Sequence, residues 1–201
     1  MEIEVKFLDV DFNDVRARLE ELSGVCEQPM RLMRRALIQT DAMIKNGRHS
    51  FMRLRDEGDK VTLTFKEFKE NSLTGASEHE VVVSDFETTL AILEEGGLKH
   101  QSLQESKRET WRVGDGVEVV LDEWPWLSPY IEIEAHSEEL VKDMATKLGF
   151  SWDDAVFGSV TEAFQIQYPN ARNPRGLIDL PEAKFGAPLP DIFKPHDDEE
   201  R

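Results

Sequence analysis

Hydrophobic and polar residues alternate along several short segments of the chain, and this alternation predicts β-strands. The first segment, residues 2–7, has the sequence Glu-Ile-Glu-Val-Lys-Phe. Side chains two residues apart in a strand point to the same face, so Glu2, Glu4 and Lys6 share one face and the apolar residues share the other. Taken alone, the segment is interpreted as a strand with a core face and a solvated face.

The same alternation predicts seven further strands, with a few helices between them. The expected strands span about residues 2–8, 33–41, 50–56, 60–68, 77–83, 103–113, 116–123 and 129–136. The expected helices span about residues 11–22, 84–95, 137–148 and 159–167. Short antiparallel strands with few helices predict a mainly β (α+β) fold, either an antiparallel barrel or a sandwich.

The composition divides the chain near its C-terminal end. From Pro169 onward it shifts towards Pro, Gly, Asn and Asp. We therefore expect one domain over residues 1–168, followed by an irregular acidic C-terminal tail over residues 169–201. A total length of 201 residues suits a single generous domain.

Charge and cysteine content narrow the functional classes. The net charge of −17 argues against general nucleic-acid binding, which needs a basic surface. No apolar run approaches the roughly 20 residues that span a membrane, and the chain opens on a charged strand rather than a signal peptide. The single cysteine, Cys26, excludes an internal disulfide and suits a reducing compartment. We expect a cytoplasmic protein that binds neither nucleic acid nor membranes.

The charged face of the first strand recurs in other strands, with the charges separated by sign. Residues 131–134 place Glu132 and Glu134 on one face, and Arg53 and Arg55 share a face of their own strand. Further charged strand positions are Lys66, Glu78, Glu80, Arg108, Arg112, Glu118 and Asp122. Carboxylates bind hard divalent cations, whereas Arg and Lys bind phosphate oxygens. An interior lined in this way is costly unless it holds water, metal and ligand, which indicates a functional site.

Other phosphate and metal motifs are missing from the sequence. It contains no Gly-x-x-x-x-Gly-Lys-Ser/Thr loop and no Gly-x-Gly-x-x-Gly motif. The five histidines lack metal-ligand spacing. The charged strands are therefore the candidate chemistry.

The ordered set of charged strands resembles the CYTH family, the triphosphate tunnel metalloenzymes, over about residues 1–168. The motifs that carry the resemblance are Glu2-Ile-Glu-Val-Lys6, Arg53-Leu-Arg55, Thr62-Leu-Thr-Phe-Lys66, Lys107-Arg-Glu-Thr-Trp111, Val120-Leu-Asp122 and Ile131-Glu-Ile-Glu134. The resemblance implies an eight-stranded antiparallel β-barrel whose tunnel binds a small-molecule triphosphate and Mg²⁺ or Mn²⁺. The sequence departs from the family at Gly158-Ser159-Val160, where Ser-Tyr is usual, and the residues after 169 have no counterpart.

The resemblance also implies a role for each charged position. The expected metal-side carboxylates are Glu2, Glu4, Asp122, Glu132 and Glu134. The expected triphosphate-binding residues are Lys6, Arg53, Arg55, Lys66, Arg108 and Glu80. The expected catalytic residues are Glu4, Lys66 and Glu134. Family members are often dimers, so a homodimer is a further expectation.

Three functions are compatible with these residues. The leading hypothesis is metal-dependent hydrolysis of the terminal phosphate of an inorganic, nucleoside or other organic triphosphate. The first alternative is a class IV adenylyl cyclase, in which the ribose 3′-hydroxyl attacks the α-phosphate of ATP and pyrophosphate leaves. The second is a non-catalytic module that binds polyphosphate or a phosphorylated metabolite. The intact carboxylates argue against it, because a pure anion binder would keep the cations and could lose the acids.

Overall fold

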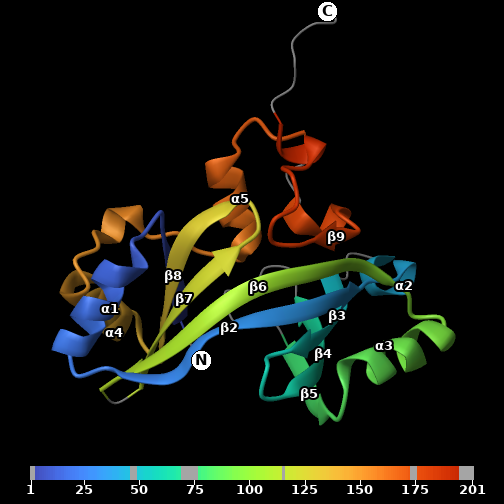
Figure 1. Ribbon diagram of the computed structural model, residues 1–201, viewed down its shortest axis with the longest axis horizontal. Coiled ribbons are helices and arrows are strands. Elements are labelled where there is room, and N and C mark those ends of the chain that lie inside the picture. Colours follow the sequence, from blue (N-terminus) through green and yellow to red (C-terminus); the bar gives the residue numbers. More distant parts are fainter. Residues whose placement is uncertain (1–2, 46–48, 69–76, 115, 173–175, 195–201) are drawn as a thin grey trace, which may run out of the picture. The chain divides into compact units, whose positions relative to one another are not determined.

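The computed structural model describes residues 3–45, 49–68, 77–114, 116–172 and 176–194 (Figure 1). These residues form two compact units, and each is described by itself. Unit 1 contains residues 32–105 and 177–184, together with Met1, and unit 2 contains residues 2–31, 106–176 and 185–201. Two long strands, β2 (Val25–Ile38) and β6 (His100–Val113), each contribute residues to both units.

The strands follow one hydrogen-bonded order, β1-β8-β7-β6-β2-β3-β4-β5, with β9 paired to β6. The remaining strands are β1 (Ile3–Leu8), β3 (His49–Asp56), β4 (Val61–Phe68), β5 (Ser77–Val83), β7 (Val117–Trp124), β8 (Leu127–Ala135) and β9 (Glu182–Ala183). The pairs β1–β8, β8–β7, β7–β6, β2–β3, β3–β4 and β4–β5 are antiparallel, whereas β9 runs parallel to β6.

The predicted mainly antiparallel β fold with peripheral helices is confirmed. Within the described ranges, the five α-helices are α1 (Phe12–Glu21), α2 (Asp41–Ile44), α3 (Phe86–Glu95), α4 (Glu138–Lys147) and α5 (Val160–Gln167). The pairing path ends at β1 and β5, and the described residues give no pair between these two strands. Closure of the eight long strands into a barrel therefore stays a prediction.

Side-chain caps fix where several helices begin. The Asp11 carboxylate accepts a hydrogen bond from the Asn13 main-chain amide at 2.7 Å. Asp85 caps α3, Ser137 caps α4 and Ser159 caps α5 in the same way. Each cap satisfies a backbone N–H that has no partner inside the helix, which stabilises the helix by about 1 kcal/mol.

The core of unit 2 lies between the apolar faces of its strands and the helices α1 and α4 (Figure 1). Val5 of β1 and Val119 of β7 both lie opposite Ile133 of β8, so these three side chains share one face. Val15 and Leu19 of α1 pack into the same cluster. This face is mainly apolar, although it includes the buried Glu109 of β6, and the opposite face of the same strands carries the residues of the predicted site.

Unit 1 has a smaller core on one face of β2, β3 and β4. Ala36, Leu54 and Phe86 are its buried members, and Phe86 brings α3 onto this face. The opposite face again carries the charged residues. Alternation along each strand therefore separates packing from chemistry in both units.

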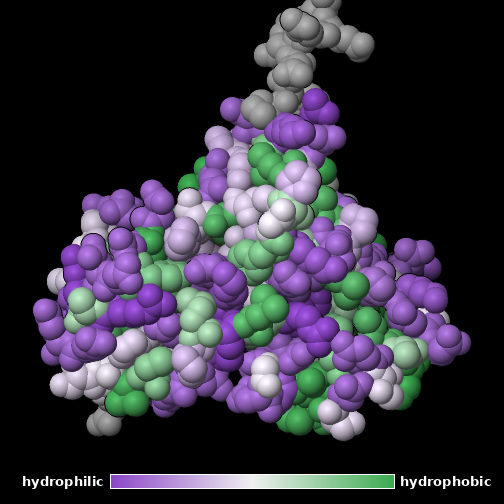
Figure 2. Space-filling view, viewed as in Figure 1, coloured by the Kyte–Doolittle hydropathy of each residue, from purple (hydrophilic) through white to green (hydrophobic). Residues whose placement is uncertain are grey.

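The C-terminal residues that the structure describes contain short ordered elements: η3 (Gly176–Asp179), β9 and η4 (Asp191–Phe193). The boundary predicted at residue 168 stays a prediction. None of the helices in the described ranges is long and apolar enough to cross a membrane. Figure 2 shows hydrophilic residues over much of the displayed face, as expected from the net charge of −17.

Candidate active site

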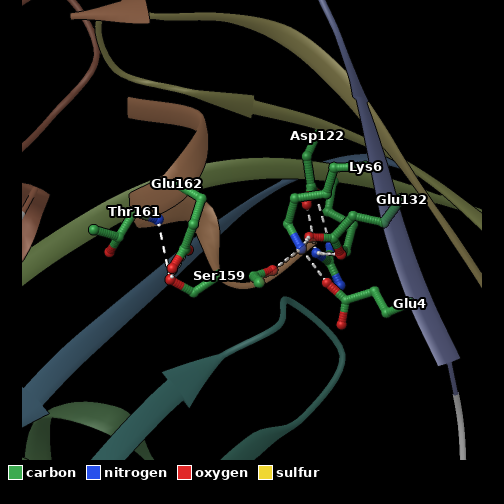
Figure 3. Close-up of polar contacts among 9 residues, drawn as sticks. Glu4, Lys6, Asp122, Glu132, Ser159, Thr161 and Glu162 are labelled. Carbon is green, nitrogen blue, oxygen red and sulfur yellow. Dashed lines mark hydrogen bonds and ion pairs between the residues drawn. The ribbon is translucent and has the colours of Figure 1, made fainter. Parts of the chain in front are cut away.

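Strand register gathers the charged positions of unit 2 onto one face of four neighbouring strands. Lys6 of β1 lies opposite Glu132 of β8, and Arg108 of β6 lies opposite Asp122 of β7. Glu4 lies opposite Glu134. Directly opposed residues in an antiparallel pair have side chains on the same face. The residues Glu4, Lys6, Arg108, Asp122 and Glu132 are called the carboxylate cluster below (Figure 3).

Lys6 lies at the centre of this cluster and is almost fully buried, with 1% of its side chain exposed. Its ammonium group pairs with Glu4, lies 3.2 Å from a carboxylate oxygen of Glu132 and donates to the Gly158 carbonyl at 2.5 Å. Burial alone lowers the pKa of Lys6, but the Glu132 and Glu4 carboxylates outweigh this and raise it. Lys6 is therefore a permanent positive charge that holds two carboxylates.

Arg108 is the second cation of the cluster. Its guanidinium binds both carboxylate oxygens of Asp122, with Nε at 2.7 Å from Oδ1, and donates to Glu132 at 2.8 Å. Burial opposes its charge, but Asp122 and Glu132 raise the pKa of Arg108 well above its ordinary value. The planar two-pronged contact fixes the Asp122 carboxylate in one orientation.

The carboxylate cluster holds one negative charge more than its cations neutralise, since three carboxylates face Lys6 and Arg108. This excess negative charge affects the pKa of Glu4. Burial raises the pKa of Glu4, and the neighbouring Glu132 charge raises it further, whereas Lys6 lowers it. For Glu132, Arg108 and Lys6 outweigh burial and lower the pKa. Glu132 is thus a stable carboxylate, and Glu4, with 43% of its side chain exposed, is its repelled neighbour.

The Gly158 carbonyl was not predicted as part of the site. The main chains of Lys6 and Val156 exchange two hydrogen bonds, at 2.8 and 2.9 Å, which brings Gly158 beside β1. Gly158 has a φ of +101°, and a Cβ there would lie 2.8 Å from the Glu162 carboxyl carbon. The only sequence signal was a glycine before Ser159, and a main-chain acceptor leaves no mark in the side-chain pattern.

Unit 1 carries the other predicted cations on the polar face of β3 and β4. Arg53 lies opposite Thr64, Arg55 lies opposite Thr62, and Thr64 lies opposite Glu80 of β5. We call Arg53, Arg55 and Lys66 the cation cluster of unit 1.

Two of these cations have carboxylate partners. Arg55 donates from Nε and Nη2 to Glu57 at 2.9 and 2.6 Å, and Lys66 lies 2.6 Å from Glu78. Glu80 accepts a hydrogen bond from Thr64 at 2.8 Å. Glu57 is buried and was not among the predicted residues, because it lies in the turn after β3, outside the alternating pattern.

Arg53 differs from its neighbours. Its Nε is buried and has no hydrogen-bond partner among the described residues. Burial, and then the Arg55 charge, lower the pKa of Arg53 to about 10. Arg53 therefore stays charged at neutral pH in a site that disfavours its charge, and an anion bound there would relieve both effects.

Glu2 lies outside the described residues. Glu134 lies on the charged face, opposite Glu4 of β1 and Glu118 of β7. The prediction separated acidic from basic sides, whereas in unit 2 the signs are interleaved. The reason is the strand order, because β1 and β6 bring Lys6 and Arg108 next to β8 and β7.

The fit of a divalent ion follows from the donor set. In the described part of the chain, no group of three or more His, Cys, Asp or Glu side chains has the arrangement of a metal site. A complete protein cage is therefore not present there. Glu4 and Glu132 form a repelling carboxyl pair, and Mg²⁺ is usually bound by one or two carboxylates with water and substrate phosphates. The pair fits an ion of this type.

Comparison with known proteins supplies the family. A protein-family sequence model, described as the CYTH domain, matches residues 1–154 of this chain. The chain belongs to the CYTH family. No curated protein matches this CYTH chain.

Solved structures show the same fold as this CYTH protein. A protein from Pyrococcus horikoshii OT3 is 22% identical, with a TM-score of 0.62 and coverage of 78% of this chain and 94% of that one. A Vibrio parahaemolyticus protein named "putative adenylate cyclase" is 12% identical, with a TM-score of 0.65 and coverage of 82% and 97%. At these identities the likeness is one of fold. The residues beyond 154, which include Gly158 and α5, lie outside the family match.

Proposed function

We propose that this CYTH protein is a divalent-metal-dependent phosphohydrolase that acts on a triphosphate. The observation that carries the proposal is the carboxyl pair of Glu4 and Glu132, held together by the buried Lys6 ammonium group. Two carboxylates forced together are stabilised by a cation placed between them. Family membership supports triphosphate chemistry as its setting.

Glu4 and Glu132 would hold Mg²⁺ or Mn²⁺, with Asp122 fixed behind them by Arg108. When bound, the ion would supply Lewis-acid stabilisation of charge that develops on phosphate oxygens. Glu134 and Glu2, which the resemblance also places with the metal, remain proposals for the same role. Interactions that strengthen as charge develops are the ones that accelerate phosphoryl transfer.

The exposed Glu4 carboxylate would orient the attacking water. Its pKa is raised by burial and by Glu132, so it is more basic than an ordinary surface glutamate. Lys6 fixes the position of this carboxylate through their ion pair. A positioned carboxylate is the group that hydrolysis requires of the protein, since water is the nucleophile.

The phosphate-binding role is proposed for Arg53, Arg55 and Lys66 in unit 1, and for Lys6 and Arg108 in unit 2. Arg53 has the strongest support, because its buried Nε–H group is a donor with no hydrogen-bond acceptor among the described residues. Lys66 would act as a point charge on the transferred phosphoryl group. Glu80 would orient Thr64, from which it accepts a hydrogen bond.

Class IV adenylyl cyclisation is the second candidate, favoured by the name of the Vibrio parahaemolyticus structure. The same charged residues serve either reaction, and the two differ in which phosphorus atom meets the nucleophile. Hydrolysis is preferred because Glu4 is solvent-accessible, with 43% of its side chain exposed.

Product analysis separates the candidates. The full chain is incubated with Mg²⁺ or Mn²⁺ and either inorganic triphosphate or ATP, and phosphate, pyrophosphate and cyclic AMP are resolved. Orthophosphate release that stops on chelation supports the proposal. Formation of cyclic AMP and pyrophosphate from ATP would instead support adenylyl cyclase activity. Tight triphosphate binding without turnover would leave a non-catalytic binding module.

A further inference from the structure

The described C-terminal segment of unit 2, residues 185–194, packs against α5 of the same unit through an aromatic stack. Phe193, with 3% of its side chain exposed, stacks on Phe164 and on Tyr168 with ring centroids 5.0 Å apart in each case. Phe164 is a buried residue of α5, and Tyr168 follows the last residue of that helix. The segment therefore holds both the middle and the end of α5.

A second contact of the same segment holds the turn between β7 and β8. Trp126 has a φ of +64°, a conformation that a bulky residue adopts only when its surroundings impose it. Its indole N–H donates to the Ala187 carbonyl at 2.7 Å, and its own carbonyl accepts from Gln167 at 2.8 Å and from the Tyr168 hydroxyl. The turn, α5 and residues 185–194 thus form one bonded group.

The first residues before α5 reach the carboxylate cluster. Ser159 caps the helix, and the preceding Gly158 carbonyl accepts the 2.5 Å hydrogen bond from Lys6 (Figure 3). A shift of α5 would move this carbonyl and the Lys6 ammonium group with it. Because Lys6 orients both Glu4 and Glu132, the displacement would reach the proposed catalytic carboxylate.

We propose that residues 185–194 position Lys6 through α5, with Phe193 as the positioning residue. The contacts that would transmit this effect lie beyond the family match of residues 1–154, apart from Lys6 and the turn at Trp126. This chain would therefore complete its site with a segment of its own. The effect on turnover rests on the proposed function, whereas the effect on Lys6 geometry does not.

Hydrogen exchange tests the structural part in the full chain, with and without Phe193→Ala. The reporters are the Lys6 and Val156 amides, which bond each other's carbonyls beside Gly158. We expect both to exchange about tenfold faster in Phe193→Ala, because the local opening that exposes them becomes easier. Val119, inside the β7–β8 ladder, should keep its rate.

Two further variants make the result specific. Phe193→Leu retains part of the apolar contact and should give an intermediate rate, and it replaces the alanine variant if that one folds poorly. Leu189→Ala alters a more exposed residue of the same segment outside the stack and should leave both amides unchanged. Wild-type exchange at Lys6 and Val156 in Phe193→Ala or Phe193→Leu would overturn the proposal.

The kinetic part compares kcat with KM for inorganic triphosphate. Misplaced catalytic groups lower turnover more than binding, so kcat should fall about tenfold in Phe193→Ala with a smaller change in KM. Unchanged kcat despite faster exchange would overturn the positioning role. If the wild-type protein has no turnover, the proposed function fails by itself, and the exchange comparison still decides whether residues 185–194 hold Lys6.

Discussion

The carboxylate cluster of unit 2 and the cation cluster of unit 1 are built from the same strand pattern but reach different electrostatic states. In unit 2, Arg108 binds two carboxylates and has a raised pKa. In unit 1, Arg53 has a buried Nε without a partner among the described residues and a pKa lowered to about 10. The protein satisfies the first arginine, whereas the Nε of the second has no hydrogen-bond partner in the part of the chain that the structure describes.

This difference shows that a charged strand face acquires its role from its neighbours in the sheet. β7 and β8 bring Asp122 and Glu132 to Arg108, and the cluster keeps one surplus carboxylate for a cation. β2 and β4 bring Leu37 and Thr64 to Arg53, and neither carries a charge. The first arrangement suits a metal ion, and the second suits an anion.

The largest expected effect follows from removing the satisfied arginine. Arg108→Ala leaves Asp122 buried without its cation and Glu132 with Lys6 alone, so the free energy of unfolding should fall by about 3–5 kcal/mol. Urea denaturation measures this loss. Arg112→Ala is the matched control on the same strand face. It should cost less than about 1 kcal/mol, because the ion pairs of Arg112 with Glu118 and Glu27 are partly exposed. Equal losses in the two variants would contradict the comparison.

Removing the unsatisfied arginine should act on binding instead. Arg53→Met keeps the apolar stem but removes a desolvated charge, so stability should change by no more than about 1 kcal/mol or increase. Triphosphate affinity should fall about 10- to 100-fold, as expected for a lost charged hydrogen bond. Calorimetric titration measures the affinity, and Arg34→Met, a surface residue paired with Asp56 and Glu87, should bind normally. Normal binding by Arg53→Met would sink the anion role.

A smaller effect is expected on the packed face of unit 2, at Glu109. Burial alone would raise its pKa, but hydrogen bonds from Arg16 and Trp111 lower it. A carboxylate whose pKa is lower in the folded state stabilises the fold above its unfolded pKa, and this contribution is lost as the pH falls through the folded pKa. Glu109→Gln should therefore cost about 1 kcal/mol at pH 7.

The pH dependence of that loss provides the check. The stability difference between Glu109→Gln and wild type, followed by denaturation as a function of pH, should shrink as the pH falls from 7 to below about 4.5. A difference that stays constant over this range would show that the charge of Glu109 contributes nothing.

The sequence predicted the charged and apolar faces well, because a period of two residues is enough to place Glu4 with Lys6 and Val5 on the other side. Family resemblance supplied the chemistry for these faces, and the family match over residues 1–154 confirms the resemblance. The predicted strand limits differ from those in the structure. β2 begins at Val25, earlier than the predicted residue 33. The first half of this strand is largely exposed, so hydrophobic and polar residues alternate only weakly along it.

Contacts that depend on strand order or on the main chain could not be predicted. Nothing in the alternation of β6 says that Arg108 meets Asp122 rather than solvent, since pairing partners are chosen by the whole sheet. The Gly158 carbonyl and the Phe193 stack depend on tertiary packing of a segment without periodic pattern. The roles of Lys66 and Glu134 in catalysis stay predictions.

Binding of Mn²⁺ to the full chain tests the central claim, that the carboxyl pair of Glu4 and Glu132 holds a divalent ion. Free Mn²⁺ is followed by electron paramagnetic resonance as protein is added, for wild type, Glu4→Gln and the control Glu118→Gln, whose carboxylate lies on the same face and pairs with Arg112. We predict that Glu4→Gln weakens Mn²⁺ binding at least about tenfold, since one of two charged ligands is lost, and that Glu118→Gln binds as wild type does. Wild-type Mn²⁺ affinity in Glu4→Gln would contradict the account.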